Sequence, residues 1–317
     1  PLVVVLHGCT QTAAGYDHGA GWSQLADRHG FALLYPEQQR ANNPNLCFNW
    51  FVPEDIRRDS GEALSIAQMV GTVIEAQGLD RRRVFITGLS AGGAMTSVML
   101  ATYPELFAGG AIVAGLPFGC ATSIPEAFDR MRGQGLPAER DLEAKVRSAS
   151  SHQGPWPTLS LWHGTADQTV AHANMDAIIA QWRGLHGLQR VTPEKNAIGL
   201  HSQRVWRDEA GVPKIEAFSV EGMGHGTPLS GADDIGASGA FMLEARISST
   251  RHIARFWQLT GTGSELSLPT NVEKLRSEAT PERVGGEPST PTSQVRASAT
   301  GVGKVIEDAL RAAGLMR

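Results

Sequence analysis

The chain has 317 residues, of which 41% are hydrophobic and 19% are charged, a composition usual for globular proteins. Its formal net charge is −4 and it has no extended run of Lys and Arg, which argues against nucleic-acid binding and favours small neutral or weakly anionic substrates. No apolar stretch is long enough to span a bilayer, and no Cys and His group has metal-ligand spacing, so we expect neither a membrane span nor a metal site.

Strands and helices alternate through most of the chain. Apolar runs that stop at polar residues, glycine or proline are typical of strands buried on both faces of a parallel sheet, and they predict strands at residues 2–6, 31–35, 84–87, 109–114, 158–162 and 215–220. Helical spacing of apolar residues predicts helices at residues 21–29, 61–77, 94–103, 174–185 and 249–257. This order indicates an α/β fold with a mostly parallel sheet, covered by helices on both faces, whose strand ends form the ligand-binding edge.

Two segments depart from this alternation. Residues 115–157 are irregular apart from a charged helix near residues 142–148, and they are expected to form a small cap over the functional site. Near the C-terminus Ser, Thr, Pro, Gly and Glu dominate and no aromatic residue follows Trp257, so that this part cannot bury enough apolar area to offset its ordering entropy. We therefore predict a folded domain at residues 1–260 and a low-complexity, flexible tail at residues 261–317.

A Gly88-x-Ser90-x-Gly92 motif lies where a predicted strand passes into a predicted helix. It matches the nucleophile elbow of α/β-hydrolases, in which small residues allow a sharp turn that exposes the serine hydroxyl. The amide of Ala91, at the start of the helix, would then face the negative charge that develops during reaction. The alternative is a glycine-rich turn with a capping serine.

A catalytic serine needs a base, and in this fold the serine, the acid and the histidine follow one another along the chain. His225 comes after the predicted strand 215–220 and lies between two glycines that keep its loop open. His201 precedes that strand and His252 lies within a predicted helix, so neither is expected at the sheet edge. His225 is therefore the candidate base, and the alternative is an ordinary loop histidine.

The candidate acid is Asp167, which follows the fifth predicted strand. An ionised carboxylate at this place would orient the imidazole and stabilise its protonated form. Asp176 is the alternative, although it lies on a predicted helix, and His163 is expected to be structural. The second oxyanion donor should come from the loop after the first strand, where we predict the backbone amide of Cys9, with Thr10 as the competitor. Thr10 is also expected to contact the substrate.

Six short segments carry a family resemblance: residues 6–12 (LHGCTQT), 21–38 (GWSQLADRHGFALLYPEQ), 47–51 (CFNWF), 88–95 (GLSAGGAM), 162–167 (WHGTAD) and 222–229 (GMGHGTPL). Together they resemble the polyhydroxybutyrate-depolymerase-type esterases, which are close to the feruloyl and acetylxylan carbohydrate esterases. The resemblance implies a secreted or exported serine hydrolase without metal or organic cofactor, with catalytic roles for Ser90, Asp167 and His225. It also implies that Trp50 lines the substrate cleft; the alternative is a core tryptophan.

The sequence differs from the family pattern in two ways. Two further strands usually precede the first strand found here and would lie beside residues 31–35, whose apolar edge would otherwise be unpaired. We therefore expect these 317 residues to be part of a longer polypeptide. Polymer-degrading members also carry an aromatic-rich surface-binding module, and the segment after Trp257 contains no aromatic residue, so the resemblance does not establish attack on solid polyester.

The three cysteines allow two interpretations. In the first, Cys9 and Cys47 form a disulfide that ties the oxyanion loop to the loop of Trp50, and Cys120 remains a free thiol. This pairing would hold the amide of Cys9 in place and would fit a secreted or periplasmic enzyme. In the second, all three are reduced, buried thiols of a cytoplasmic enzyme.

The leading functional hypothesis is ester hydrolysis by residues 1–260 through an acyl-enzyme on Ser90. The expected partner is a small-molecule or oligomeric ester, foremost a soluble short-chain 3-hydroxyalkanoate ester or oligomer, and next a feruloyl or acetyl ester of plant carbohydrate. The same triad also serves serine peptidases and acyltransferases, because one fold hosts many chemistries. A catalytically inactive binding domain is the remaining alternative, and the complete set of site residues argues against it.

Overall fold

The computed structural model describes residues 1–260, and the predicted tail at residues 261–317 lies outside the described residues. Within residues 1–260, eight strands form the central sheet: β1 (Leu2–Leu6), β2 (Ala32–Leu34), β3 (Val84–Leu89), β4 (Gly109–Val113), β5 (Thr158–Gly164), β6 (Glu194–Ile198), β7 (His201–Arg207) and β8 (Pro213–Val220). Their order is β2-β1-β3-β4-β5-β8-β7-β6. Six neighbouring strands of this order run parallel, namely β2, β1, β3, β4, β5 and β8. Strand β7 is antiparallel to both of its neighbours, β8 and β6. The mostly parallel α/β fold expected from the sequence is thus confirmed.

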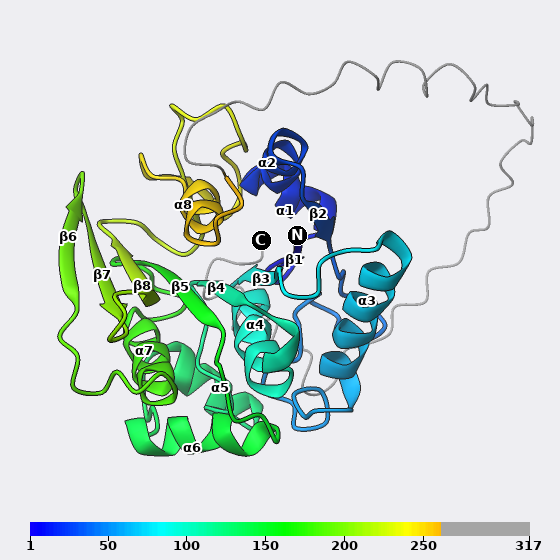
Figure 1. The fold of residues 1–317 in the computed structure, drawn as a ribbon, viewed down its shortest axis with the longest axis vertical. Coiled ribbons are helices and arrows are strands. Elements are labelled where there is room, and N and C mark those ends of the chain that lie inside the picture. Colours follow the sequence, from blue (N-terminus) through cyan, green and yellow to red (C-terminus); the bar gives the residue numbers. More distant parts are fainter. Residues whose placement is uncertain (261–317) are drawn as a thin grey trace, which may run out of the picture.

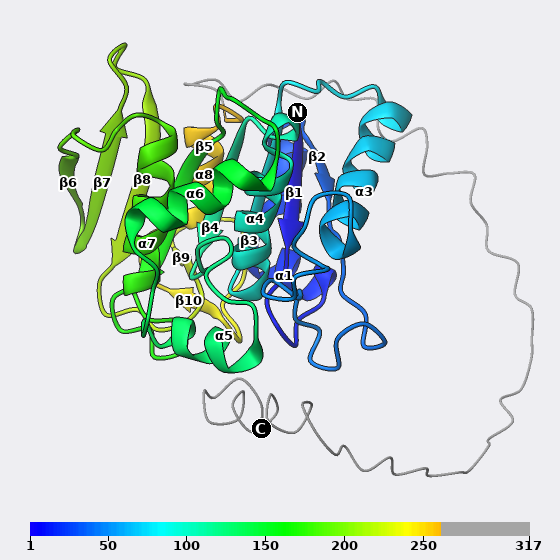
Figure 2. The same cartoon turned by 90° about the horizontal axis from the view of Figure 1, so that it is seen from below.

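Helices cover both faces of this sheet (Figure 1). Their bounds are α1 (Ala13–Ala20), α2 (Trp22–His29), α3 (Gly61–Gln77), α4 (Ala91–Thr102), α5 (Ile124–Met131), α6 (Glu139–Ala149), α7 (Ala173–Leu185) and α8 (Ser249–Phe256), with a 3₁₀ turn at Pro104–Leu106. One face carries α1, α2 and α8, and the other carries α3, α4, α6 and α7 (Figures 1 and 2). A small parallel sheet of β9 (Thr227–Leu229) and β10 (Met242–Glu244) lies after β8.

The two helical layers explain why the central strands are continuously apolar. Successive side chains of a strand point to opposite faces, so a strand covered on both sides needs apolar residues at every position. In β1, Leu2 and Leu6 belong to the core beneath α3 and α4, whereas Val3 and Val5 belong to the core with Trp22 of α2. All five side chains of β1 are at most 1% exposed.

Several elements escaped prediction from the sequence. In the hairpin of β6 and β7, β6 is largely exposed and both strands are mostly polar, so the hairpin lacks the apolar run that marks the buried strands. The strand ending before His225 is therefore the eighth rather than the sixth. In the segment predicted as an irregular cap, α6 packs against α7 within the helical layer, and the second helix, α5, was missed. The strand predicted at residues 31–35 forms β2, which pairs with β1 at one edge of the sheet.

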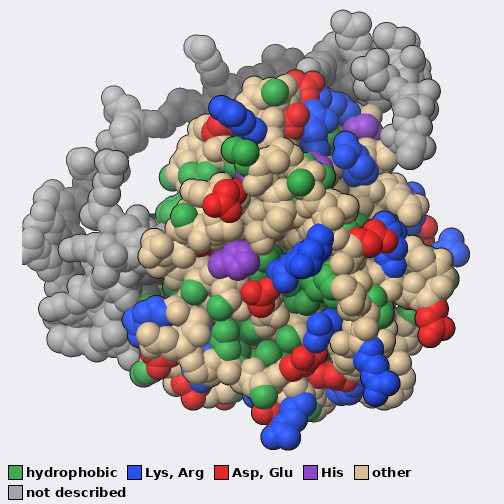
Figure 3. Space-filling view, turned by 90° about the vertical axis from the view of Figure 1, so that its left-hand side faces the viewer, with side chains coloured by type: hydrophobic (Ala, Val, Ile, Leu, Met, Phe, Trp, Pro, Cys, Tyr) green, Lys and Arg blue, Asp and Glu red, His purple; other side chains and the backbone are tan. Residues whose placement is uncertain are grey.

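On the face seen from the side of β6, acidic and basic side chains are interspersed (Figure 3). No helix among residues 1–260 is long and apolar enough to cross a bilayer. The same residues contain no group of three or more His, Cys, Asp or Glu side chains that could hold a metal ion.

Candidate active site

Ser90 occupies a strained turn between β3 and α4, with φ of 57° and ψ of −117°. Positive φ is unusual for a residue with a side chain, and such strain is characteristic of functional turns. The flanking glycines are required by close packing: a Cβ on Gly88 would lie 2.4 Å from the carbonyl carbon of Gly92, and a Cβ on Gly92 would lie 2.4 Å from the carbonyl oxygen of Leu6. The G-x-S-x-G motif therefore lets α4 start directly against the sheet while the serine hydroxyl projects from its edge.

The structure brings the three predicted side chains together from three strand ends. His225, five residues after β8, lies with Nε2 2.9 Å from the Oγ of Ser90. Its Nδ1 lies 2.7 Å from Oδ2 of Asp167, three residues after β5. In the neutral tautomer that fits both contacts, the Ser90 hydroxyl donates to Nε2, and Nδ1–H donates to the carboxylate of Asp167. This is the hydrogen-bond sequence of a nucleophile, a base and an orienting acid.

The surroundings of Asp167 keep it ionised. Its side chain is fully buried, and Oδ1 accepts hydrogen bonds from the amides of Thr169 and Val170, both at 2.9 Å. Burial raises the pKa of this carboxyl, but hydrogen bonds from His163 and His225 outweigh it and hold the pKa below its ordinary value. His163 also donates from Nε2 to the carbonyl oxygen of Val170, so it helps to fix the loop that carries the acid.

The other candidates make different contacts. Asp176 lies on α7 and forms an ion pair with Arg204 at 2.8 Å. His201 begins β7, where its ring bonds the carbonyl oxygen of Ala245 and accepts from the amide of Glu221. His252 lies on α8 against aromatic rings of the core. These residues thus have structural partners away from Ser90.

Two residues that line the cavity beside Ser90 have free backbone amides. Cys9 and Ala91 both line this cavity, and neither amide has a hydrogen-bond acceptor among residues 1–260. The competing donor, Thr10, is placed differently: its amide donates to the carbonyl oxygen of Asn45 at 2.8 Å, and its side chain is exposed. Because that amide is already engaged, the structure does not support Thr10 as the oxyanion donor. A contact of its exposed side chain with the substrate stays a prediction.

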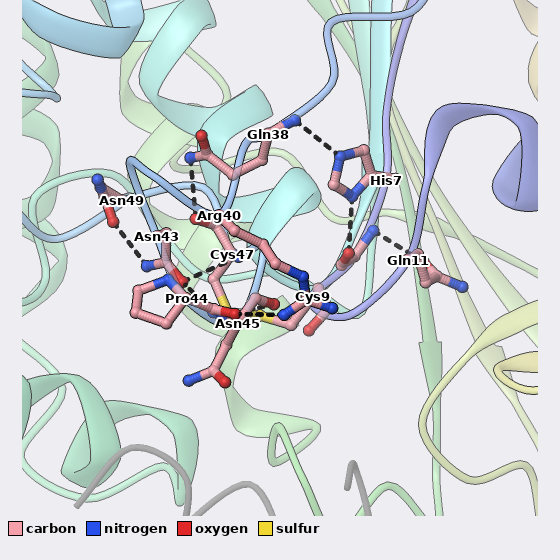
Figure 4. The surroundings of a disulfide bond; sticks show 12 residues. His7, Cys9, Gln11, Gln38, Arg40, Asn43, Pro44, Asn45, Cys47 and Asn49 are labelled. Carbon is pink, nitrogen blue, oxygen red and sulfur yellow. Dashed lines mark hydrogen bonds between the residues drawn. A yellow bond between two sulfur atoms is a disulfide. The ribbon is translucent and has the colours of Figure 1, made fainter. Parts of the chain in front are cut away.

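A disulfide joins the loop after β1 to the loop before α3, since Cys9 and Cys47 are bonded (Figure 4). Cys120 is a free, buried thiol, and burial raises its pKa to about 12. The loop of Cys47 also carries Trp50, which is 7% exposed and lines the cavity beside Ser90 together with Phe51. The disulfide thus links one of the two free amides to the aromatic wall of the cavity.

Known proteins are similar to this chain in sequence and in fold. The family model described as esterase PHB depolymerase matches residues 1–209. The chain belongs to this family. It is 44% identical over 266 residues to poly(3-hydroxyalkanoate) depolymerase C of Paucimonas lemoignei, covering 82% of this chain and 64% of that protein. It is 33% identical over 238 residues to an acetylxylan esterase of Coprinopsis cinerea, covering 73% of this chain and 63% of that protein.

Among solved structures, the acetyl xylan esterase from Aspergillus awamori superposes with a TM-score of 0.68 at 25% identity, covering 82% of this chain and 89% of that one. The chain therefore has the α/β-hydrolase fold that the resemblance implied, and it belongs to a family of esterases. It spans slightly less than two thirds of the length of the two sequence relatives.

The domain also contains a buried polar cluster that the sequence did not reveal. The carboxylate of Glu62, on α3, accepts hydrogen bonds from the amide of Asn49 at 2.8 Å, from Nε2 of Gln38 at 2.6 Å and from Nδ2 of Asn42 at 2.8 Å. Gln38 also donates to the carbonyl oxygen of Cys47 at 3.0 Å. Burial raises the pKa of Glu62 to about 7, although its hydrogen bonds oppose this shift. The cluster thus fixes the loop of Cys47 to α3 and the rest of the domain.

A second polar chain fixes the loop after β1 (Figure 4). The backbone amide of Gln38 donates to Nε2 of His7 at 3.1 Å, and Nδ1 of His7 donates to the carbonyl oxygen of Gly8 at 2.8 Å. Burial lowers the pKa of His7, in keeping with the neutral ring that these contacts require. The side-chain oxygen of Gln11 accepts from the amide of Gly8 at 2.8 Å. These contacts hold the backbone that leads into Cys9.

Proposed function

We propose that this esterase cleaves carboxylic esters through an acyl-enzyme on Ser90, with His225 as base and Asp167 as its orienting acid. The observation that carries the proposal is the pair of contacts at His225, 2.9 Å from the Ser90 hydroxyl and 2.7 Å from Asp167. A hydroxyl held by an imidazole in this way becomes nucleophilic because the base removes its proton during attack.

The reaction follows from these groups. The Oγ of Ser90 attacks the ester carbonyl carbon while its proton passes to Nε2 of His225, and the carbonyl oxygen becomes an oxyanion. The free amides of Cys9 and Ala91 would stabilise that charge. The intermediate then expels the alcohol oxygen, which takes the proton from His225 and leaves the acyl group on Ser90. Water, deprotonated by His225, attacks the acyl-enzyme in the same manner and releases the carboxylic acid.

Soluble short-chain 3-hydroxyalkanoate esters or oligomers are the proposed substrates. The 44% identity to a protein named poly(3-hydroxyalkanoate) depolymerase supports this choice. The cavity beside Ser90 supports it too, because its lining is mainly aliphatic and aromatic. Acetyl or feruloyl esters of carbohydrate are the second candidate, favoured by the structural similarity to the acetyl xylan esterase.

The purified protein should hydrolyse p-nitrophenyl butyrate and methyl esters of 3-hydroxybutyrate oligomers, and it should not cleave a matching peptide p-nitroanilide. A fluorophosphonate should label it irreversibly. Ser90→Ala should abolish both labelling and turnover, whereas Ser65→Ala, an exposed serine on α3, should keep both. Faster turnover of acetylated xylan than of the oligomers would favour the second substrate class, and an unlabelled, inactive wild type would refute the proposal.

We also propose that the enzyme works outside the reducing cytoplasm. The disulfide of Cys9 and Cys47 lies beside the nucleophile, and such bonds persist in oxidising compartments. Thiol titration of the unfolded, unreduced protein from its native host should find one free cysteine, which would be Cys120. Finding three thiols would contradict this location.

A further inference from the structure

Ser90 borders two cavities with different walls. The first is the apolar cavity described above, and its members include Trp50, Leu116, Ile124, Phe128, Met131 and Val170. The second is a smaller cleft, lined by Gly8, Gln11, His225 and Phe241 among others. Ser90 and Cys9 border both. An ester bound at Ser90 therefore has one place for each of its two halves.

The position of His225 decides which cavity takes the alcohol half of the ester and which takes the acyl half. The departing alcohol oxygen must receive its proton from Nε2 of this histidine, and proton transfer requires hydrogen-bond distance. His225 borders the small cleft and is not among the residues that line the apolar cavity. The alcohol half must therefore leave on the side of Gln11 and Phe241, which directs the acyl half into the apolar cavity.

The geometry points to α5 as the element that selects the acyl group, with Ile124, Phe128 and Met131 forming one wall of an acyl pocket. This inference rests on the proposed function, since it assigns the two sides of the same site. The substrate class that follows is an ester with a neutral, apolar acyl chain.

The chemistry of the pocket supports this class. Among its lining residues none is charged, and the polar side chains are those of Ser90 and Asn43. The amide oxygen of Asn43 already accepts from the backbone of Asn45 at 2.9 Å and of Cys47 at 3.3 Å. A charged acyl group would lose its hydration without gaining a partner, whereas each added methylene would gain apolar contact.

The helix is held in place. The amide of Ala171 donates to the carbonyl oxygen of Met131 at 2.7 Å, and Nδ2 of Asn174 donates to that of Arg130 at 2.8 Å. Ala171 follows Val170, whose amide bonds the carboxylate of Asp167. The pocket wall and the acid of the triad therefore share one anchored segment. The anchored helix α5 can then limit the length of the acyl chain that the pocket accepts.

Two ester series test the assignment. The first varies the acyl group over p-nitrophenyl acetate, butyrate, hexanoate and succinate, and the second varies the alcohol over methyl, propyl and benzyl butyrate. Wild type should prefer butyrate and hexanoate to acetate and should discriminate against succinate. Met131→Trp, which fills the pocket, should lower the hexanoate-to-acetate ratio of kcat/KM by about tenfold. It should leave the benzyl-to-methyl ratio within about twofold of wild type, whereas Phe241→Ala should change that ratio and spare the acyl ratio.

Asp129→Ala is the matched control on α5, because this residue lies outside the pocket and pairs with Arg132. It should leave both ratios unchanged. If Met131→Trp does not fold, Phe128→Ala tests the same wall by enlargement and should raise turnover of p-nitrophenyl octanoate relative to hexanoate. An active enzyme in which Met131→Trp alters the alcohol ratio, or neither ratio, would overturn the assignment. Loss of the proposed function is a distinct outcome, since wild type would then be unreactive toward every ester and toward fluorophosphonate.

Discussion

The two walls of the apolar cavity are built in different ways. The first, here called the loop wall, consists of residues 43–51 and has almost no regular secondary structure. It is held by the disulfide of Cys47 and by the buried carboxylate of Glu62. The second wall is α5, whose helix satisfies its own backbone and needs only a few contacts to the segment before α7.

This difference follows from where each wall finds hydrogen-bond partners for its backbone, and it suggests that the two walls have different roles. An irregular buried segment must find outside partners for its backbone, whereas a helix provides its own. The loop wall is also joined to Cys9, whose free amide borders Ser90, so its position bears on the chemical step. Residues of the helix wall line the acyl pocket and none belongs to the triad, so changes there should affect which ester is chosen more than how fast the reaction proceeds.

The largest effect should come from opening the disulfide. Replacing both Cys9 and Cys47 by serine should reduce the free energy of unfolding by about 3–4 kcal/mol, because the cross-link spans 38 positions of sequence. It should also lower kcat by roughly tenfold to a hundredfold, since the amide of Cys9 loses its fixed position. Urea unfolding and turnover of p-nitrophenyl butyrate measure the two effects. Cys120→Ala is the control, and a similar loss of kcat in it would contradict the explanation.

A smaller effect is expected from the carboxylate of the loop wall. Glu62→Gln places an amide nitrogen against donors such as the backbone N–H of Asn49, which should cost about 1–3 kcal/mol of stability and lower kcat several-fold with little change in KM. Glu216→Gln is a matched control. Glu216 is also buried, but it bonds Ser160 and Gln203 within the sheet.

The control should lose comparable stability and keep its kcat. Equal losses of kcat in both variants would show that Glu62 acts through the stability of the fold alone.

The two glutamates also predict how stability changes with pH. Burial raises the pKa of Glu62 and of Glu216 to about 7, from an ordinary value of 4.5. The folded state then binds more protons than the unfolded state, so this stabilisation is complete below about pH 4.5 and is lost as the pH rises through 7. Asp167 acts in the opposite sense, because its pKa is lowered and its contribution is lost in acid.

Urea unfolding at pH 5, 6, 7 and 8 should show stability falling with pH, and the slope should flatten in each glutamine variant. A slope that both variants leave unchanged would mean that these carboxyls titrate alike in the folded and unfolded states.

The smallest effect should come from loosening the helix wall. Asn174→Ala removes the side-chain donor to the carbonyl oxygen of Arg130 and should cost about 1 kcal/mol. Turnover of p-nitrophenyl acetate should be nearly unchanged, while KM for the hexanoate ester should rise a few-fold because α5 is less well held. A fall in kcat for both esters would mean that the helix wall also supports the chemical step, which would erase the contrast between the walls.

The elements on which the site is built could be predicted because each has a local cause. The continuous apolar runs of β1 and β3 follow from burial on both faces, and the glycines around Ser90 follow from a turn that admits no larger residue. Asp167 and His225 could be singled out because parallel strands end at one edge of the sheet. The hairpin of β6 and β7 was missed because its pairing depends on β8 rather than on an apolar pattern of its own.

The sequence by itself determined the α/β class, the family, the three residues that meet at the sheet edge and the two ways in which the cysteines could be arranged. Only the tertiary structure decided which backbone amide stays free, because Thr10 is engaged by Asn45, a partner 35 positions away in the chain. It alone revealed the role of Glu62, since a single glutamate in a helix resembles any surface residue until the loop that it binds is folded over it. Such contacts join residues distant in sequence, and no local pattern of side chains encodes them.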